Sequence, residues 1–537
     1  MTATGGGGGT TWGSLRPLLL RLHFYAGVVI GPFLLVAAVT GLAYTATPQI
    51  ESIVYEHELK VTPRGAASPL SEQVAAAERA VPDGTLLSVT KGAGPTDSTR
   101  VTFAKDGLAE GYTLTAFVDP YDHEVLGTLE TFGQWLPARA WLDDLHRNLH
   151  LGEFGRNYSE LAASWLWVEV LGGLALWAGT PRNRQRLRRL VTPAGGAKGR
   201  RRTMSWHGAV GLWASIGLLG LSATGLTWSA HAGASIGEVQ DALGGSTPAV
   251  STALPAAGSS GRNGEGTRGD VGIDAAVASA HDAGLRGVLV VTPPAEAGTA
   301  YVVKENTRSW PVRQDSVAVA PATGEVTQTL RFDDFPLLAK LTRWGIDAHM
   351  GLLFGLVNQI VLALLAIGLI AMILWGYRMW WLRRPTRSEG FALGRAPARG
   401  AWRRIPGRVL APAVVLAAVI GYYLPLFGLP LLVFLVVDVT VGVVRRRRAG
   451  SPRDRRERTA LDPDADVRRT RTARAVAAGP ADDGPHGPGG PRAARRDGRP
   501  HDRDGLAVGH GPRRGTPGGP VHRGCTVVPC GLPAPAR

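Results

Sequence analysis

The sequence predicts a polytopic, mainly α-helical membrane protein in which a unit of helix, small α+β domain and helix occurs twice and a helical hairpin follows. Three observations lead to this class. Of the 537 residues, 45% are hydrophobic and only 19% are charged. The apolar residues gather in windows that reach the roughly 20 residues needed to cross a bilayer. Two long segments between these windows alternate in the way that is typical of strands.

The order of apolar, basic and mixed stretches divides the chain into eleven segments. We expect a cytoplasmic N-terminus (1–17), a first span (18–45), a first extracytoplasmic domain (46–145), a second span with an outer extension (146–180), a basic cytoplasmic loop (181–203), a third span (204–230), a second extracytoplasmic domain (231–345), a fourth span (346–382), a cytoplasmic loop (383–408), a hairpin of two spans (409–444) and a disordered tail (445–537).

The two mixed segments carry similar local patterns. In the first, SEQVAAAERAVP (71–82) has the spacing of a short amphipathic helix, and in the second GIDAAVASAHDAG (272–284) has the same character. Strand-like stretches follow each helix. The hairpin is predicted from its length and from LPLFGLP (424–430), whose prolines and glycines are a turn signal.

Basic residues are concentrated next to the apolar windows. Residues 181–202 contain nine Lys or Arg and no acid, and Arg445–Arg448 end the hairpin. By the positive-inside rule these segments are cytoplasmic, which places the protein in the inner (cytoplasmic) membrane with its N-terminus inside. The net charge of +16 also raises the alternative of nucleic-acid binding. Clusters at membrane ends indicate lipid instead, so we expect no nucleic acid as partner.

The first and third spans align without a gap. His23 aligns with His207, and Thr40-Gly41-Leu42 aligns with Thr224-Gly225-Leu226. At the second and fourth spans, His150-Leu-Gly aligns with His349-Met-Gly. His146 has no counterpart in this alignment, because Gly345 takes its place. Both copies start and end inside, and such parallel repeats are related by an axis along the membrane normal.

Four histidines therefore stand in two matched pairs. His23 and His207 start spans at the cytoplasmic side, and His150 and His349 start spans at the outer side. One such histidine alone is typical of an interfacial residue. The joint pattern instead suits a flat ligand with one imidazole on each side, as in a haem with two axial histidines. Two pairs in two leaflets would form a path for electrons. His146 stays open as the ligand in place of His150.

Other polar residues near these positions are candidates for supporting roles. Arg156 could pair with a haem propionate, and His146 could do the same if it is not a ligand. Glu169 is an acid inside a span, which makes it a functional candidate. No C-x-x-C-H occurs, so any haem is held non-covalently. No nucleotide, flavin or zinc-protease motif occurs either. An electron donor, cytoplasmic or a quinol, therefore binds from outside this chain.

The repeated HxxxG…TGL helix, the entries LHRNLHLGEFG and DAHMGLLFG and the two α+β modules resemble the PepSY-associated transmembrane family. The resemblance covers roughly residues 15–445. This family includes iron-regulated inner-membrane proteins and reductases of iron-loaded siderophores. The resemblance implies two non-covalent haem b groups and outward electron transfer to ferric siderophores, that is, a membrane haem-dependent ferric-chelate reductase. The ligands that it implies are His23, His207, His150 and His349, with His146 as the alternative.

Two other functions stay open. PepSY modules elsewhere occur in protease propeptides, so the chain could be an anchored interaction protein that regulates an extracytoplasmic peptidase, without redox activity. Transport of iron chelates is the third reading, and the absence of broken-helix signals argues against it. The tail is rich in Arg, Pro, Gly and Ala and resembles an out-of-frame reading of GC-rich DNA, so we hypothesise a frameshift there. The catalytic residues are unknown, and no metal site is predicted.

Overall fold

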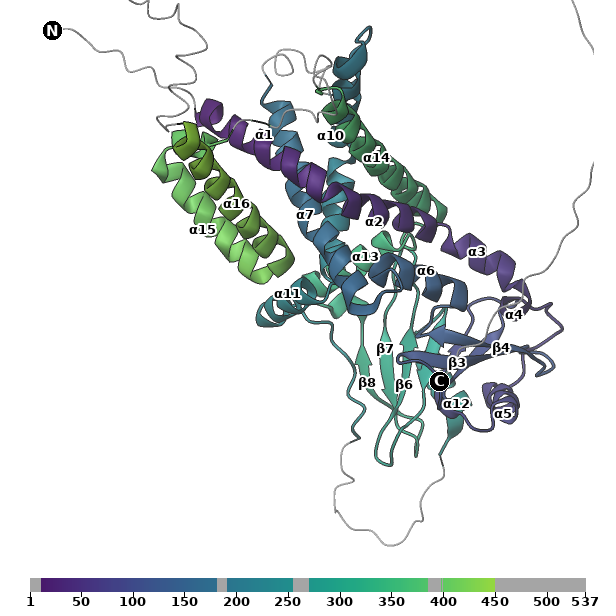
Figure 1. Ribbon diagram of the computed structural model, residues 1–537. Helices are drawn as coiled ribbons and strands as arrows, with labels where there is room; N and C mark the ends of the chain where they lie inside the picture. Colours follow the sequence, from purple (N-terminus) through teal and green to yellow (C-terminus); the bar gives the residue numbers. More distant parts are fainter. Residues whose placement is uncertain (1–10, 181–190, 255–269, 385–396, 398, 450–537) are drawn as a thin grey trace, which may run out of the picture. The chain divides into compact units, whose positions relative to one another are not determined.

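The computed structural model describes residues 11–180, 191–254, 270–384, 397 and 399–449 (Figure 1). Four of its helices are long and apolar enough to cross a membrane, and a fifth span is possible if a bent helix pair counts as one. The prediction of a multi-pass membrane protein is thereby confirmed. The four are α7 (Gly152–Ala178), α10 (Gly199–Leu226), α14 (Gly355–Trp381) and residues 425–445 of α16 (Pro425–Ala449).

The first predicted span is a broken helix. Its halves, α1 (Thr11–Val29) and α2 (Gly31–Tyr44), meet at an angle of 58°. Pro32 has no N–H and so leaves the carbonyl of Val28 without its helical partner. The Tyr377 hydroxyl of α14 donates to that carbonyl at 2.9 Å. The expectation that no span is broken is therefore wrong, and Pro32 was the signal.

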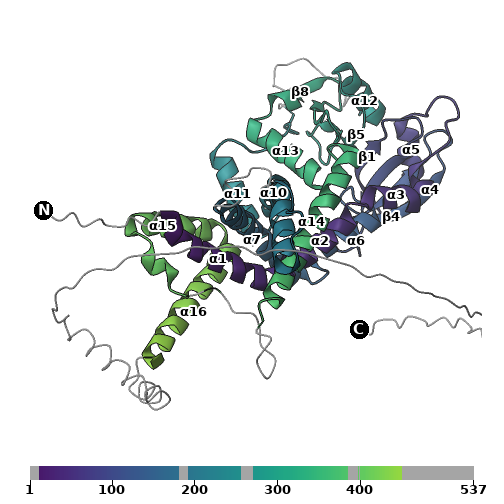
Figure 2. The ribbon, with the colours of Figure 1, turned by 90° about the horizontal axis from the view of Figure 1, so that it is seen from above.

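The C-terminal hairpin forms, with different boundaries. α15 (Gly407–Tyr423) has 17 residues and is shorter than the spanning helices. Only Leu424 separates it from α16. Pro430, which was expected in the turn, lies inside α16. The helices run side by side (Figures 1 and 2). α16 continues to Ala449, so the predicted start of the tail at residue 445 is wrong. Residues 450–537 lie outside the described residues.

The hairpin is attached to the bundle by polar contacts. Asp438 of α16 forms an ion pair with Arg21 of α1, which is only 3% exposed. The indole N–H of Trp165 in α7 donates to the carbonyl of Leu426 at 3.2 Å. A buried charge needs such a partner in an apolar environment. These contacts place α16 against α1 and α7.

The two predicted α+β segments contribute to one antiparallel sheet of eight strands in the order β4-β3-β2-β1-β5-β6-β7-β8. The halves meet at the pair β1–β5, where Val89 faces Val291. The strands are β1 (Thr85–Lys91), β2 (Thr99–Ala104), β3 (Tyr112–Val118), β4 (Val125–Phe132), β5 (Leu289–Thr292), β6 (Tyr301–Glu305), β7 (Ser316–Val319) and β8 (Val326–Leu330).

Two helices pack against this sheet and form its core. α5 (Leu70–Ala80) and α12 (Gly272–Asp282) bury Val74 and Ala276 in one cluster with strand residues such as Val101 and Val303. The carboxylate of Asp274 in α12 accepts the backbone N–H groups of Leu70 and Ser71, which caps the start of α5. The halves of the sheet are therefore joined by helix contacts as well as by strand pairing.

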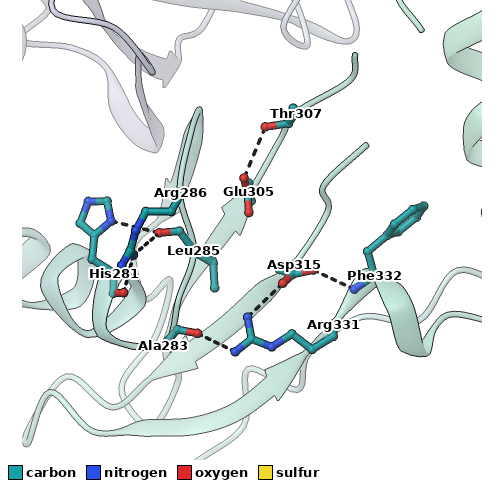
Figure 3. Close-up of polar contacts among 9 residues, drawn as sticks. All are labelled: His281, Ala283, Leu285, Arg286, Glu305, Thr307, Asp315, Arg331 and Phe332. Carbon is teal, nitrogen blue, oxygen red and sulfur yellow. Dashed lines mark hydrogen bonds and ion pairs between the residues drawn. The ribbon is translucent and has the colours of Figure 1, made fainter. Parts of the chain in front are cut away.

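Short helices connect the sheet to the spanning helices. Two of them lead directly into spans: α6 (Pro137–Asn148) precedes α7, and α13 (Leu337–His349) precedes α14. Arg331 holds the segment before α13 by donating to Asp315 at 3.0 Å and to the carbonyl of Ala283 (Figure 3). The remaining connections are α3 (Thr47–Val54), α4 (Glu56–Leu59), α11 (His231–Ala242) and η1 (Phe332–Asp334). A further short helix, η2 (Ala401–Arg404), lies between α14 and α15.

Candidate functional site

His23 of α1 and His207 of α10 face each other inside the bundle, and we call them the inner pair. Their ring centroids lie 6.4 Å apart, with an angle of 72° between the ring planes. Two imidazoles bound to opposite sides of one metal ion have centroids roughly 6 Å apart, because each bond from nitrogen to metal is about 2 Å long. The spacing of the inner pair therefore matches a shared metal centre.

A hydrogen bond holds the ring of His207, and a close contact with a carboxylate holds that of His23. Nδ1 of His207 lies 3.0 Å from the carbonyl oxygen of Met372, and Nδ1 of His23 lies 2.8 Å from Oε2 of Glu169. A carbonyl and a carboxylate only accept, so Nδ1 carries the proton in each ring. Within the described part of the chain, no group hydrogen-bonds Nε2 of either ring. The Nε2 lone pairs are thus available for a ligand.

Glycines make room beside the inner pair. A Cβ added at Gly173 of α7 would lie 3.3 Å from Cε1 of His23, and one at Gly211 of α10 would lie 3.2 Å from Sδ of Met372. Contacts this short displace a neighbouring side chain. Small residues at these two positions therefore let the helices and the imidazoles approach closely.

A second pair of histidines lines a cavity of about 370 Å3. It consists of His146 of α6 and His349 of α13, and we call it the outer pair. The cavity walls come from α2, α7, α10 and α14 and are largely apolar; they include Leu34, Leu166, Leu218, Leu362 and Leu369. Its volume lies within the range of pockets that hold cofactor-sized molecules, about 300–1,000 Å3.

The rings of the outer pair are oriented by two equivalent threonines. Nδ1 of His146 lies 2.9 Å from Oγ1 of Thr40, and Nδ1 of His349 lies 2.6 Å from Oγ1 of Thr224. Each hydroxyl also lies within 2.9 Å of the backbone carbonyl four residues earlier, to which it donates its single proton. Nδ1 must then be the donor to the hydroxyl. Nε2 again keeps its lone pair, and no described residue bonds to it.

The outer histidines are neutral. They lie on α6 and α13, outside the spanning helices. Burial lowers the pKa of His146 to about 4. Burial, together with the nearby His146, lowers the pKa of His349 to about 3. Both residues line the cavity. A neutral imidazole is the form that binds a metal, so no proton has to leave first at neutral pH.

One part of the cavity wall is cationic. Arg147, Arg156 and Arg308 line it. The buried Nε atoms of Arg147 and Arg156 have no hydrogen-bond partner in the described structure. Buried donors without partners are costly, and an anion with carboxylate groups would satisfy both. The cavity therefore offers imidazoles, apolar walls and guanidinium groups to one ligand.

The model of the PepSY-associated TM region family matches residues 20–383, which include both histidine pairs. The chain belongs to this family. A search of curated proteins gave no match. The resemblance seen in the sequence is thereby confirmed, and the family range covers α2, α7, α10 and α14 in full.

In this PepSY-associated transmembrane protein, His23 and His207 come together as the repeat predicts, but His150 does not join His349. His150 lies in the turn after α6 with a positive φ of 53°. Its Nδ1 contacts Oδ2 of Asp144 at 2.6 Å, and its ring centroid lies 4.8 Å from that of Trp141, with the two planes tilted by 36°. Its side chain is 35% exposed, and it does not line the cavity. The structure thus brings His349 together with His146 and leaves His150 outside the cavity.

A different alignment of the second and fourth spans agrees with the positions of these residues in the structure. Gly152 begins α7 and Gly355 begins α14, both with positive φ, and each helix has 27 residues. The offset that joins these glycines also carries His146 onto His349. The alignment used the local match of His-x-Gly and slipped by one turn of helix. Thr40 and Thr224, which the sequence repeat contains, were the missed signal, because each bonds one member of the true pair.

Proposed function

We propose that this PepSY-associated transmembrane protein binds two b-type haems and passes electrons outward across the inner membrane to an acceptor such as a ferric siderophore. One observation carries the proposal. Four histidines stand in two pairs, and in each of them Nδ1 is held by a neighbour while Nε2 is left without a partner among the described residues. This is the arrangement of imidazoles that ligate a metal through Nε2.

The residues of the outer cavity fit a haem. His146 and His349 would hold the iron, the leucine-rich walls would contact the macrocycle, and Arg147 and Arg156 would pair with the propionates. The residues of the inner pair fit as well, because the spacing of 6.4 Å suits two axial ligands. A haem held by two histidines supplies one-electron chemistry without an open coordination position.

We further propose that the scaffold is duplicated and oriented with its N-terminus inside. Matched hydrogen bonds from Thr40 to His146 and from Thr224 to His349 support the duplication. The symmetric strand order about β1 and β5 supports it too. Basic residues in the first turn of α10 (Arg200–Arg202) and just after α14 (Arg383–Arg384) favour a cytoplasmic position for those ends. On this orientation the outer cavity lies at the extracytoplasmic side.

Reoxidation of the reduced protein tests the proposed function. Purified protein is reduced with dithionite, excess reductant is removed, and ferrioxamine is added while the haem α band is followed. We expect the band to decay as one Fe(II) forms per electron, which ferrozine would trap. The same siderophore loaded with gallium, which accepts no electron, is the control. A haem that stays reduced with the ferric form would contradict the proposal. A folded but colourless protein would favour the anchored interaction protein instead.

The close contact at Gly41 gives a prediction for the outer site. A Cβ at this position would lie 3.1 Å from Cε1 of His146. We expect the methyl group added in Gly41→Ala to displace the His146 ring and to weaken haem binding at the outer site at least tenfold. Haem titration of the purified protein measures this. The matched control is Gly220→Ala in α10, where a Cβ would meet nothing within 4 Å. Equal haem affinity in the two variants would show that haem binding does not depend on the close approach of the His146 ring to Gly41.

A further inference from the structure

The inner and outer pairs differ in the charge that contacts their histidines. At the inner pair, the Glu169 carboxylate lies 2.8 Å from Nδ1 of His23, and its side chain is only 12% exposed. Its other oxygen, Oε1, is buried without a hydrogen-bond partner among the described residues. The basic side chains nearby are bonded elsewhere: Arg21 pairs with Asp438, and Arg378 donates to Thr203. The nearest charge to the inner pair is therefore negative.

At the outer pair, the groups that hold the rings are the neutral hydroxyls of Thr40 and Thr224. The carboxylates around this cavity are engaged by other partners. Both oxygens of Glu160 accept backbone N–H groups at the start of α11. Asp143 lies 3.5 Å from Arg147, and Asp347 lies between Arg308 and Arg343. No described carboxylate contacts an outer ring. Three arginines line the cavity; Arg147 and Arg308 are the partners just named, and Arg156 forms no ion pair in the described structure.

These differences act on a metal in opposite directions. A carboxylate that accepts the Nδ1 proton makes the imidazole a stronger donor and favours the oxidised, more positive metal. Cationic surroundings favour the reduced state. We infer that Glu169 sets the reduction potential of the inner site below that of the outer site, so that an electron entering at the inner pair moves outward downhill. This inference rests on the proposed function, since it concerns the same two sites.

Redox titration of the holoprotein with Glu169→Gln tests the inference. The amide keeps the size of the side chain and removes its charge. We expect the lower of the two midpoint potentials to rise by at least 59 mV, which is a tenfold change for a one-electron couple, while the higher one stays. The matched control is Glu153→Gln, at an exposed position in the first turn of α7, which should move neither potential. Unchanged potentials in the Glu169 variant, or a shift of the higher one, would overturn the inference.

Two further measurements keep the test decisive if the Gln variant loses haem. In His207→Ala, the haem that disappears should be the one of lower potential; loss of the one of higher potential would overturn the inference. In the unaltered holoprotein, a redox infrared difference spectrum should contain a carboxylate band that follows the lower potential, and its absence would also count against Glu169. An unaltered protein that binds no haem would instead contradict the proposed function. If the Glu169→Gln variant binds two haems and both potentials equal those of the unaltered protein, the inference is contradicted while the proposed function stands.

Discussion

Replacing His146 by alanine will remove about half of the bound haem, whereas replacing His150 by alanine will leave the haem content unchanged. The reason is the position of the two rings. His146 lines the cavity together with His349 and is held there by Thr40. His150 lies outside the cavity and contacts Asp144 and Trp141. The two residues are only one turn apart in sequence, so each variant serves as the matched control of the other.

The pyridine haemochrome assay on detergent-purified protein measures this difference, with gel-filtration elution as the check that both variants fold. His349→Ala should match His146→Ala, because the two histidines belong to one site. A loss of haem in His150→Ala with full haem in His146→Ala would restore the pairing predicted from the sequence and contradict the outer pair of the structure.

Replacing Asp347 by alanine will strongly destabilise the outer end of the bundle. Asp347 is fully buried, at 0% exposure, and its two oxygens lie 2.7 Å and 2.9 Å from Nε of Arg308 and Arg343. Removing it leaves two guanidinium groups without their counter-charge. Removing one partner of a buried pair costs about 3–5 kcal/mol. The change also disturbs His349, which lies two residues further along α13.

Thermal unfolding of the purified variant measures this cost, and the absorption spectrum reports the outer haem. The matched control is Lys60→Ala, which breaks an ion pair with Asp97 in which the lysine is 55% exposed. Exposed pairs contribute below about 1 kcal/mol, so the control should unfold close to the unaltered protein. A variant of Asp347 that is as stable as the Lys60 variant would show that the buried cluster does not hold α13.

The parts of the fold that depend on local sequence could be predicted. Apolar windows gave the spanning helices, and alternation gave the strands of both mixed segments. The pair His23 and His207 followed from a gapless repeat, which holds although the first span is bent and α10 is continuous. The bend at Pro32 was also local, since a proline inside an apolar helix removes one hydrogen bond, but it was not recognised.

The parts that depend on pairing between distant segments could not be predicted. The sheet is continuous because β1 pairs with β5, some two hundred residues later, and nothing in either strand specifies that partner. Predicting the outer site required the correct alignment of α6 with α13. Turns before α7 and α14 separate these two helices from the spans, so the repeat in the spans does not fix that alignment. The two identical residues of the His-x-Gly match at His150 then outweighed the alternative alignment, which places His146 on His349.

The absorption spectrum of the purified protein, oxidised and then reduced with dithionite, tests the central claim most directly. We expect a Soret band, a sharp α band after reduction and two haems per chain by the pyridine haemochrome assay. Both haems should be low-spin, as six-coordinate iron with two imidazoles requires. A folded protein with no Soret band would contradict the claim that the two histidine pairs hold iron.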